Sequence, residues 1–165
     1  MVYGGAVSKA AHTIPMSFRG RFDHTLDNKG RVSVPAGFRM EIQRLGGDRA
    51  PILTRGKDHL RLYPAETWDT IEQDLSEKSS LLPDVQNYQR FLIGGCTECP
   101  VDAQGRITIP AVLRDFAGLE GKITLAGVLD KIEIWNSDHF EAAQQLTLSR
   151  LGDIEMSVDR SVSGS

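Results

Sequence analysis

The sequence has few of the features that mark disulfide-rich, membrane or nucleotide-binding proteins. Its 165 residues include two cysteines, Cys96 and Cys99, which are too few for a disulfide framework. No apolar run approaches the roughly 18 residues of a membrane helix, and residues 1–15 lack the apolar core of a secretory signal. Phosphate-binding glycine loops and hydrolase or metalloprotease motifs are also missing. We therefore expect a cytoplasmic protein that has no catalytic centre and needs no cofactor or metal.

Net charge is small, but the charges are unevenly distributed along the chain. The whole sequence has a net charge of −3 and 25% charged residues, which is ordinary for a globular protein. Residues 1–50 hold 8 basic and 4 acidic side chains, whereas residues 51–100 hold 5 and 8, and residues 101–165 hold 6 and 10. Positive charge gathered at one end of the sequence is typical of a local phosphate-facing patch rather than of a general polyanion binder.

An internal duplication is the most informative feature of the sequence. Residues 27–39 read D-N-K-G-R-V-S-V-P-A-G-F-R, and residues 102–114 read D-A-Q-G-R-I-T-I-P-A-V-L-R. Six positions are identical at an offset of 75: Asp27/Asp102, Gly30/Gly105, Arg31/Arg106, Pro35/Pro110, Ala36/Ala111 and Arg39/Arg114. The similarity continues at an offset of 72 over residues 60–69 and 132–141. Each copy has about seventy residues, which is small for an independent core, so we expect the two copies to share one.

Each copy predicts the order β-β-α-β-β-α. In the first copy we expect strands at 18–22, 32–34, 52–54 and 60–63, with helices from Pro35 to Gly46 and from Pro64 to Leu75. Strands 18–22 and 32–34 flank the turn D-N-K-G and are expected to form a hairpin. In the second copy we expect strands near 97–101, 106–109, 122–127 and 131–135, and helices from about 111 and 137.

The chain is expected to divide into two repeats with short flanking segments. The predicted parts are a flexible leader (1–15), a first AbrB-like repeat (16–78), a linker helix (79–94), a second AbrB-like repeat (95–150) and a mobile tail (151–165). The linker helix is predicted from the helical spacing over residues 83–93. The tail is predicted to be mobile because it is rich in Ser, Asp and Gly.

These motifs resemble the MraZ family of bacterial transcriptional regulators, which belongs to the AbrB-like group. The resemblance rests on Phe18-Arg19-Gly20, on the duplicated D-x-x-G-R followed by a mainly β-branched triplet and a proline, and on Leu62-Tyr63-Pro64 at the start of a helix. It covers roughly residues 16–145. It implies an α+β fold in which duplicated β-β-α-β-β-α units form a pseudo-dimeric swapped-hairpin barrel.

The resemblance also implies a function and partners. It suggests a sequence-specific regulator that binds double-stranded DNA at repeated sites upstream of its own division and cell-wall gene cluster. It further suggests a homo-oligomer, a ring, that is cytoplasmic and nucleoid-associated and has no membrane partner. The family's DNA-contacting arginine, in the first D-x-x-x-R copy, corresponds to Arg31.

The first turn motif carries most of the residues that we expect to contact DNA. Asp27 and Arg31 can meet across the turn in a salt bridge, worth about 0–1 kcal/mol if exposed, that orients the guanidinium toward a phosphate or a guanine edge. Asp102 and Arg106 are predicted to form the same supporting bridge among more acidic neighbours. We therefore expect DNA on the first copy. The predicted contacts are Arg31, Lys29, Arg21, Arg19 and Asn28.

Each of these signals also has a structural explanation. Arg19 and Arg21 could be the solvated face of a strand, and Arg39 could cover apolar surface with its stem. Cys96 and Cys99 form a C-x-x-C, but it enters a strand and supplies only two of the roughly four ligands of a structural zinc, so packing is favoured over redox or metal function. The alternative for the whole protein is an oligomeric scaffold or interaction module without a DNA role.

Overall fold

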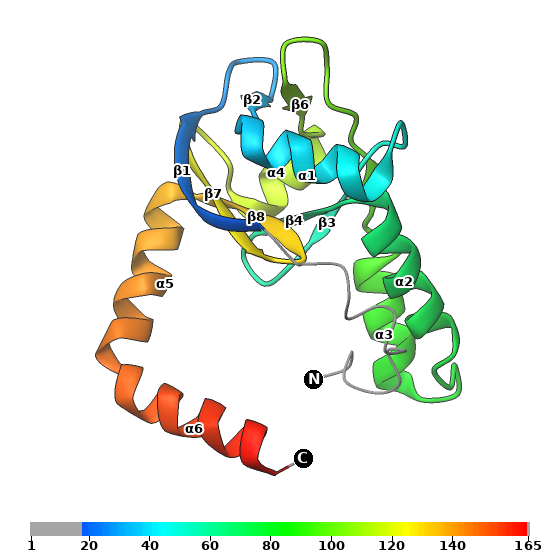
Figure 1. The fold of residues 1–165 in the computed structure, drawn as a ribbon, viewed down its shortest axis with the longest axis vertical. Helices are drawn as coiled ribbons and strands as arrows, with labels where there is room; N and C mark the ends of the chain where they lie inside the picture. Colours follow the sequence, from blue (N-terminus) through cyan, green and yellow to red (C-terminus); the bar gives the residue numbers. More distant parts are fainter. Residues whose placement is uncertain (1–17, 165) are drawn as a thin grey trace.

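The computed structural model describes residues 18–164, so the predicted leader over residues 1–15 lies outside the described residues. The described chain forms two sheets and six helices (Figure 1). The strands are β1 (Phe18–Thr25), β2 (Arg31–Ser33), β3 (Ile52–Arg55), β4 (Leu60–Tyr63), β5 (Thr97–Glu98), β6 (Arg106–Thr108), β7 (Lys122–Leu129) and β8 (Lys131–Asn136). The helices are α1 (Ala36–Gly46), α2 (Ala65–Ser76), α3 (Pro83–Leu92), α4 (Ala111–Ala117), α5 (Ser137–Ser149) and α6 (Leu151–Ser163). The fold is mixed α+β, as predicted.

The equivalent helices α1 and α4 begin directly after prolines that end β2 and β6. Pro35 (φ −53°, ψ 143°) and Pro110 (φ −57°, ψ 145°) have extended backbone conformations. Proline has no N–H for ladder pairing, and its fixed φ suits the start of a helix. Phe38 and Ile42 of α1 are buried, and the helix ends at Gly46 as the sequence predicted. The same sequence pattern therefore places a helix after each short strand.

The strand pairing differs from the predicted hairpins at the start of each copy. The six-stranded sheet has the order β1-β7-β8-β4-β3-β5, and β2 pairs with β6 in a separate two-stranded sheet. The hairpins β3–β4 and β7–β8 confirm the prediction for the second half of each copy. Strand β1, however, pairs along its length with β7 rather than with β2. The expected hairpin between residues 18–22 and 32–34 is therefore wrong, because alternation predicts a strand but not its partner.

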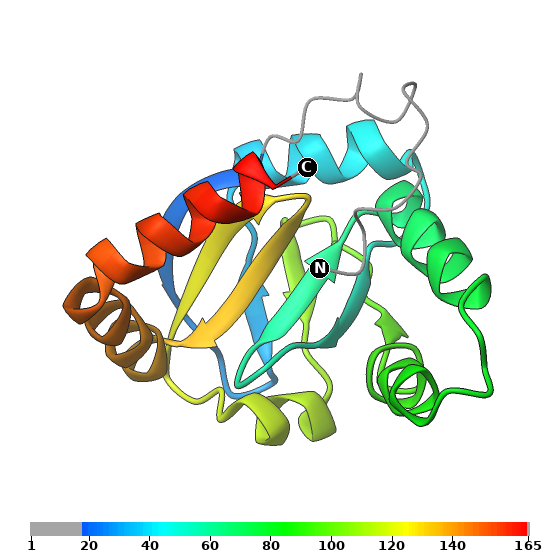
Figure 2. The same ribbon diagram turned by 90° about the horizontal axis from the view of Figure 1, so that it is seen from below.

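One core is shared by both copies, as the short length of each copy led us to expect. Its buried side chains come from β1, from the β2–β6 pair, from the central strands β3, β4, β7 and β8, and from α1 and α4. Helices α1 and α4 flank the strands on opposite sides (Figure 2). A second, smaller cluster joins α2 and α3 around Trp68 and Leu92. Within the segment predicted as a linker helix (79–94), residues Pro83–Leu92 form α3.

The C-terminal segment, predicted to be a mobile tail, contains the regular helix α6. Its apolar residues Leu151, Ile154, Val158 and Val162 recur at helical spacing. The prediction of a mobile tail rested on the Ser, Asp and Gly content and did not use this spacing. No residue of α6 is buried, and α5 and α6 extend from the body on one side while α2 and α3 lie on the other (Figure 1). The structure therefore differs from an unstructured tail, and the mobility of this helix stays a prediction. Among the helices over residues 18–164, none is long and apolar enough to cross a membrane.

Candidate nucleic-acid interface

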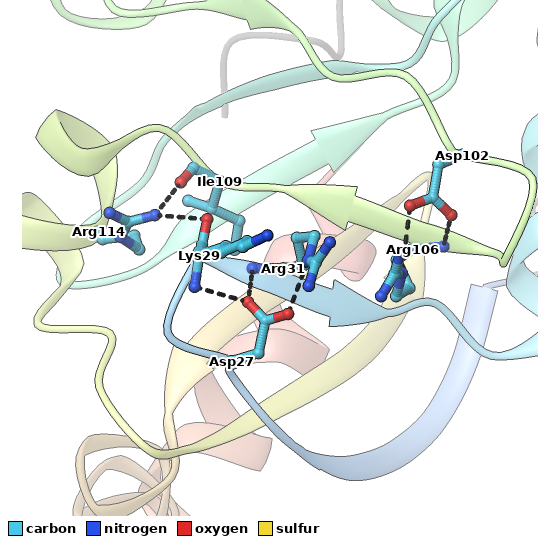
Figure 3. A network of polar contacts seen from close by, with 7 residues as sticks. All are labelled: Asp27, Lys29, Arg31, Asp102, Arg106, Ile109 and Arg114. Carbon is cyan, nitrogen blue, oxygen red and sulfur yellow. Dashed lines mark hydrogen bonds and ion pairs between the residues drawn. The ribbon is translucent and has the colours of Figure 1, made fainter.

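The β2–β6 pair is an antiparallel ribbon that takes one strand from each copy. Its register is Arg31 opposite Thr108, Val32 opposite Ile107, and Ser33 opposite Arg106. The central residues point into the core, where Val32 is 1% and Ile107 0% exposed. Because successive side chains of a strand point to opposite faces, the four flanking side chains point outward. Arg31 and Arg106 therefore lie on one outward face, although they belong to different copies (Figure 3).

The turn before β2 is held by the carboxylate of Asp27. Its Oδ1 accepts hydrogen bonds from the backbone N–H of Lys29 at 2.9 Å and of Arg31 at 2.8 Å. Its Oδ2 accepts a third from Nε of the Arg31 side chain at 2.7 Å (Figure 3). The Arg31 backbone N–H, together with these other donors, lowers the pKa of Asp27 to about 2. The carboxylate stays charged and fixes the direction of the Arg31 guanidinium.

The second copy repeats this arrangement at the other end of the ribbon. Oδ1 of Asp102 accepts from the backbone N–H of Gln104 and of Arg106, both at 2.9 Å. Oδ2 accepts from Nε of Arg106 at 3.2 Å, and the Arg106 backbone N–H is the main reason that the pKa of Asp102 is lowered. Both predicted aspartate–arginine salt bridges are present in the structure.

Two further arginines cross between the copies and brace the turns. Arg114, on α4 of the second copy, donates from Nη1 to the carbonyl of Ile109 at 2.8 Å and reaches the Lys29 carbonyl at 3.5 Å (Figure 3). Its guanidinium lies against Gly30, whose φ is +79°. Sequence reasoning left Arg114 without a role, although its identity with the residue 75 positions earlier was the available signal.

The equivalent arginine of the first copy braces the opposite turn. Arg39, on α1, donates from Nη1 to the carbonyl of Val34 at 2.6 Å. Its guanidinium lies against Gly105 of the second copy, where φ is +76°. From the sequence we expected only that the stem of Arg39 covers apolar surface. The structure shows that its guanidinium also donates a hydrogen bond. The two ends of the ribbon are therefore each supported by the other copy.

The structure brings together only some of the predicted contacts. Lys29 and Asn28 are exposed on the turn that precedes Arg31. Arg19 and Arg21 instead lie on β1, in the six-stranded sheet. Arg21 forms ion pairs with Asp23 and with Glu141 of α5.

The contacts of Arg21 and the position of Arg106 bear on which copy supplies the basic surface. The guanidinium of Arg21 also stacks over Phe140, and its hydrogen bond with Glu141 is the main cause that raises its pKa. Arg106, by contrast, was expected only to support its turn, and it shares the outward face of the ribbon with Arg31. The basic face is therefore built by both copies rather than by the first alone.

Comparison with known proteins agrees with the duplicated architecture. A family model described as "MraZ protein, putative antitoxin-like" matches residues 17–91 and matches again over residues 92–155. The chain belongs to the MraZ family. Each match contains one of the two D-x-x-G-R turns, and each turn leads into one strand of the ribbon.

Several similar proteins are named transcriptional regulator MraZ. That of Solidesulfovibrio magneticus is 43% identical over 125 residues, which cover 75% of this chain and 82% of that protein. That of Natranaerobius thermophilus is 37% identical over 138 residues, covering 83% of this chain and 93% of the relative. That of Lactiplantibacillus plantarum is 38% identical over 138 residues, covering 83% and 94%. These names describe regulators, which confirms the expectation that this MraZ-family chain is not an enzyme.

The cysteines of this MraZ-family chain take part in packing. Cys99 is 2% exposed within the main core, and burial raises the pKa of its thiol to about 12. Cys96 packs against the second cluster, and burial is the main cause that raises its thiol pKa. A raised pKa disfavours the thiolate that redox chemistry and metal binding require. Within residues 18–164, no group of three or more His, Cys, Asp and Glu residues could hold a metal ion.

Proposed function

We propose that this chain is a transcriptional regulator that binds double-stranded DNA with the β2–β6 ribbon. The observation that carries the proposal is the outward face on which Arg31 and Arg106 are each oriented by a carboxylate. A two-stranded ribbon fits the major groove of B-DNA, where a planar guanidinium can bind O6 and N7 of a guanine. The printed names of the relatives, transcriptional regulator MraZ, support the same function.

Individual side chains have different roles in the proposed complex. Arg31 and Arg106 contact bases or phosphates from the ribbon, while Asp27 and Asp102 hold them in place. Lys29 and Asn28, on the exposed turn, contact the DNA backbone that flanks the bases under the ribbon. Their counterparts in the second copy are Gln104 and Ala103, so the first turn carries the stronger phosphate contact.

Two further predicted contacts are secondary in this proposal. Arg19 and Arg21 lie on β1, outside the ribbon, where they could meet phosphates of the same duplex. Arg21 would first have to release Glu141 and Asp23, which already compensate its charge. We therefore expect changes at these two positions to weaken binding less than changes in the ribbon.

The proposed assembly follows from how little DNA one ribbon can contact. The exchanged strand pairings fit a pseudo-dimeric swapped-hairpin barrel, which presents one ribbon per chain. A ring homo-oligomer would link several weakly binding ribbons, and linkage raises the effective concentration of each at the next site. Such an assembly would bind repeated sites upstream of its own division and cell-wall genes, as the resemblance to MraZ implies, and would be cytoplasmic and nucleoid-associated.

Fluorescence anisotropy tests this proposal against an oligomeric scaffold that does not bind DNA. The probe is the duplex directly upstream of the protein's own coding sequence, compared with a scrambled duplex at about 50 and about 200 mM salt. We expect salt-sensitive binding that prefers the upstream duplex. Arg31→Ala should cost about 1–3 kcal/mol per engaged ribbon if it reads a base. The matched control is Arg160→Ala, which removes one exposed positive charge from α6.

The outcomes separate the two candidate functions. Binding that is lost in Arg31→Ala and kept in Arg160→Ala supports the regulator. Equal weakening on both duplexes would reduce Arg31 to a phosphate contact. A correctly folded oligomer that binds neither duplex at low salt would favour the scaffold.

A further inference from the structure

The outward face of the ribbon carries two hydroxyl side chains, Ser33 and Thr108, besides the two arginines. Both are exposed, and Thr108 lies directly opposite Arg31 while Ser33 lies opposite Arg106. Neither hydroxyl forms a hydrogen bond with any residue in the described range 18–164, so the fold does not use them. Two polar groups in the middle of the proposed interface are therefore available to a ligand.

We infer that Thr108 is a specificity-determining residue whose methyl group contacts the C5-methyl group of a thymine in the major groove. This inference rests on the proposed DNA-binding function and deepens it. The thymine methyl distinguishes A·T pairs in the major groove, and the threonine methyl is one of the apolar groups that read it. The free hydroxyl of Thr108 can contact a neighbouring base edge at the same time.

The geometry of the ribbon lets Thr108 and Arg31 read neighbouring base pairs. Side chains directly opposite each other in an antiparallel pair have Cβ atoms about 4.5–5.5 Å apart. Successive base pairs are about 3.4 Å apart along the helix axis. The bases contacted by the two side chains are therefore one or two steps apart. Because threonine is β-branched, its χ1 is restricted and its methyl is held in few positions.

The outward face of the ribbon differs between its two halves, so the ribbon can bind a site in a preferred orientation. The four outward residues are related by the duplication, with Arg31 equivalent to Arg106 and Ser33 equivalent to Thr108. The arginines are identical, so the extra methyl of Thr108 is what distinguishes the two halves of this face. A thymine preference under Thr108, without one under Ser33, would orient each chain on its site.

The test compares binding to the upstream duplex made with thymine and to the same duplex made with deoxyuridine, which lacks the C5-methyl group. We expect the wild-type protein to bind the thymine duplex about fourfold more tightly, as one buried methyl group predicts. Thr108→Ser keeps the hydroxyl and removes the methyl, so it should bind both duplexes equally. Thr147→Ser, the same change on α5, should keep the wild-type ratio.

Each outcome decides the inference. Equal binding of the two duplexes by wild type would overturn it, and so would a thymine preference that Thr108→Ser retains, because the preference would then come from DNA shape or another side chain. Failure of wild type to bind either duplex would instead overturn the proposed function itself, and the inference with it.

Discussion

At the scale of single residues, the aspartate of each turn fixes both the turn and the arginine side chain that follows it. Asp27 accepts two backbone N–H groups and the Nε of Arg31, so one carboxylate closes the turn and aims the guanidinium. The spacing of aspartate and arginine in the sequence was enough to predict this pair. It could not predict the roles of Arg39 and Arg114, because the turn glycines that their guanidinium groups lie against belong to the other copy.

The lowered pKa of Asp27 gives a prediction with a definite sign. Its pKa is about 2 in the folded chain against an ordinary value of 3.8. The carboxylate therefore stabilises the folded turn fully above the unfolded value, and this stabilisation is lost as the pH falls from 3.8 toward 2. A ¹³C NMR titration of the carboxyl carbon, assigned with Asp27→Asn, should give a midpoint near 2. A midpoint at the ordinary value would show that the three hydrogen bonds do not form in solution.

At the scale of elements, the two turns and the ribbon between them form one braced unit. Each turn needs a glycine, because Gly30 (φ +79°) and Gly105 (φ +76°) occupy the left-handed region and face an arginine of the other copy. A side chain there would meet both backbone strain and the guanidinium of Arg114 or Arg39. The two glycines therefore allow each turn to close against an arginine of the other copy.

Substitution of these glycines should destabilise the protein. Gly30→Ala and Gly105→Ala should each lower the free energy of unfolding by at least about 1–2 kcal/mol, the cost of the left-handed backbone. Urea denaturation followed by circular dichroism measures this. Gly37→Ala is the matched control, because Gly37 lies in α1 with nothing within 4 Å of an added Cβ. If Gly30→Ala proved as stable as Gly37→Ala, the left-handed turn that brings Gly30 against Arg114 would be wrong.

Local elements could be predicted from the sequence far better than their pairing. The hairpins around Gly56 and Asp130 follow from short turns between apolar strands, and the helices after Pro35 and Pro110 follow from proline chemistry. The exchange of β1 and β2 between copies could not be derived in this way. Alternation assigns a face to each strand, but the choice between a neighbouring and a distant partner depends on the shared core.

At the scale of the whole molecule, duplication creates a surface that neither copy has alone. Strand β1 of the first copy joins the sheet beside β7, and β2 completes the ribbon with β6. Val32 and Ile107 anchor the inner face of the ribbon in the core, so Arg31 and Arg106 lie on its outward face. A distribution of charge that looks one-sided along the sequence therefore becomes a face with an arginine from each half.

The most direct test of this account is the affinity of Arg106→Ala for the upstream duplex, measured by anisotropy beside wild type, Arg31→Ala and Arg160→Ala. Because both ribbon arginines share one face, Arg106→Ala should weaken sequence-selective binding by about 1–3 kcal/mol per ribbon, the same loss that we expect for Arg31→Ala, with the fold intact by circular dichroism. Arg160→Ala should bind like wild type. Wild-type affinity in a folded Arg106→Ala protein, with binding lost only in Arg31→Ala, would contradict a ribbon that both copies use to bind DNA.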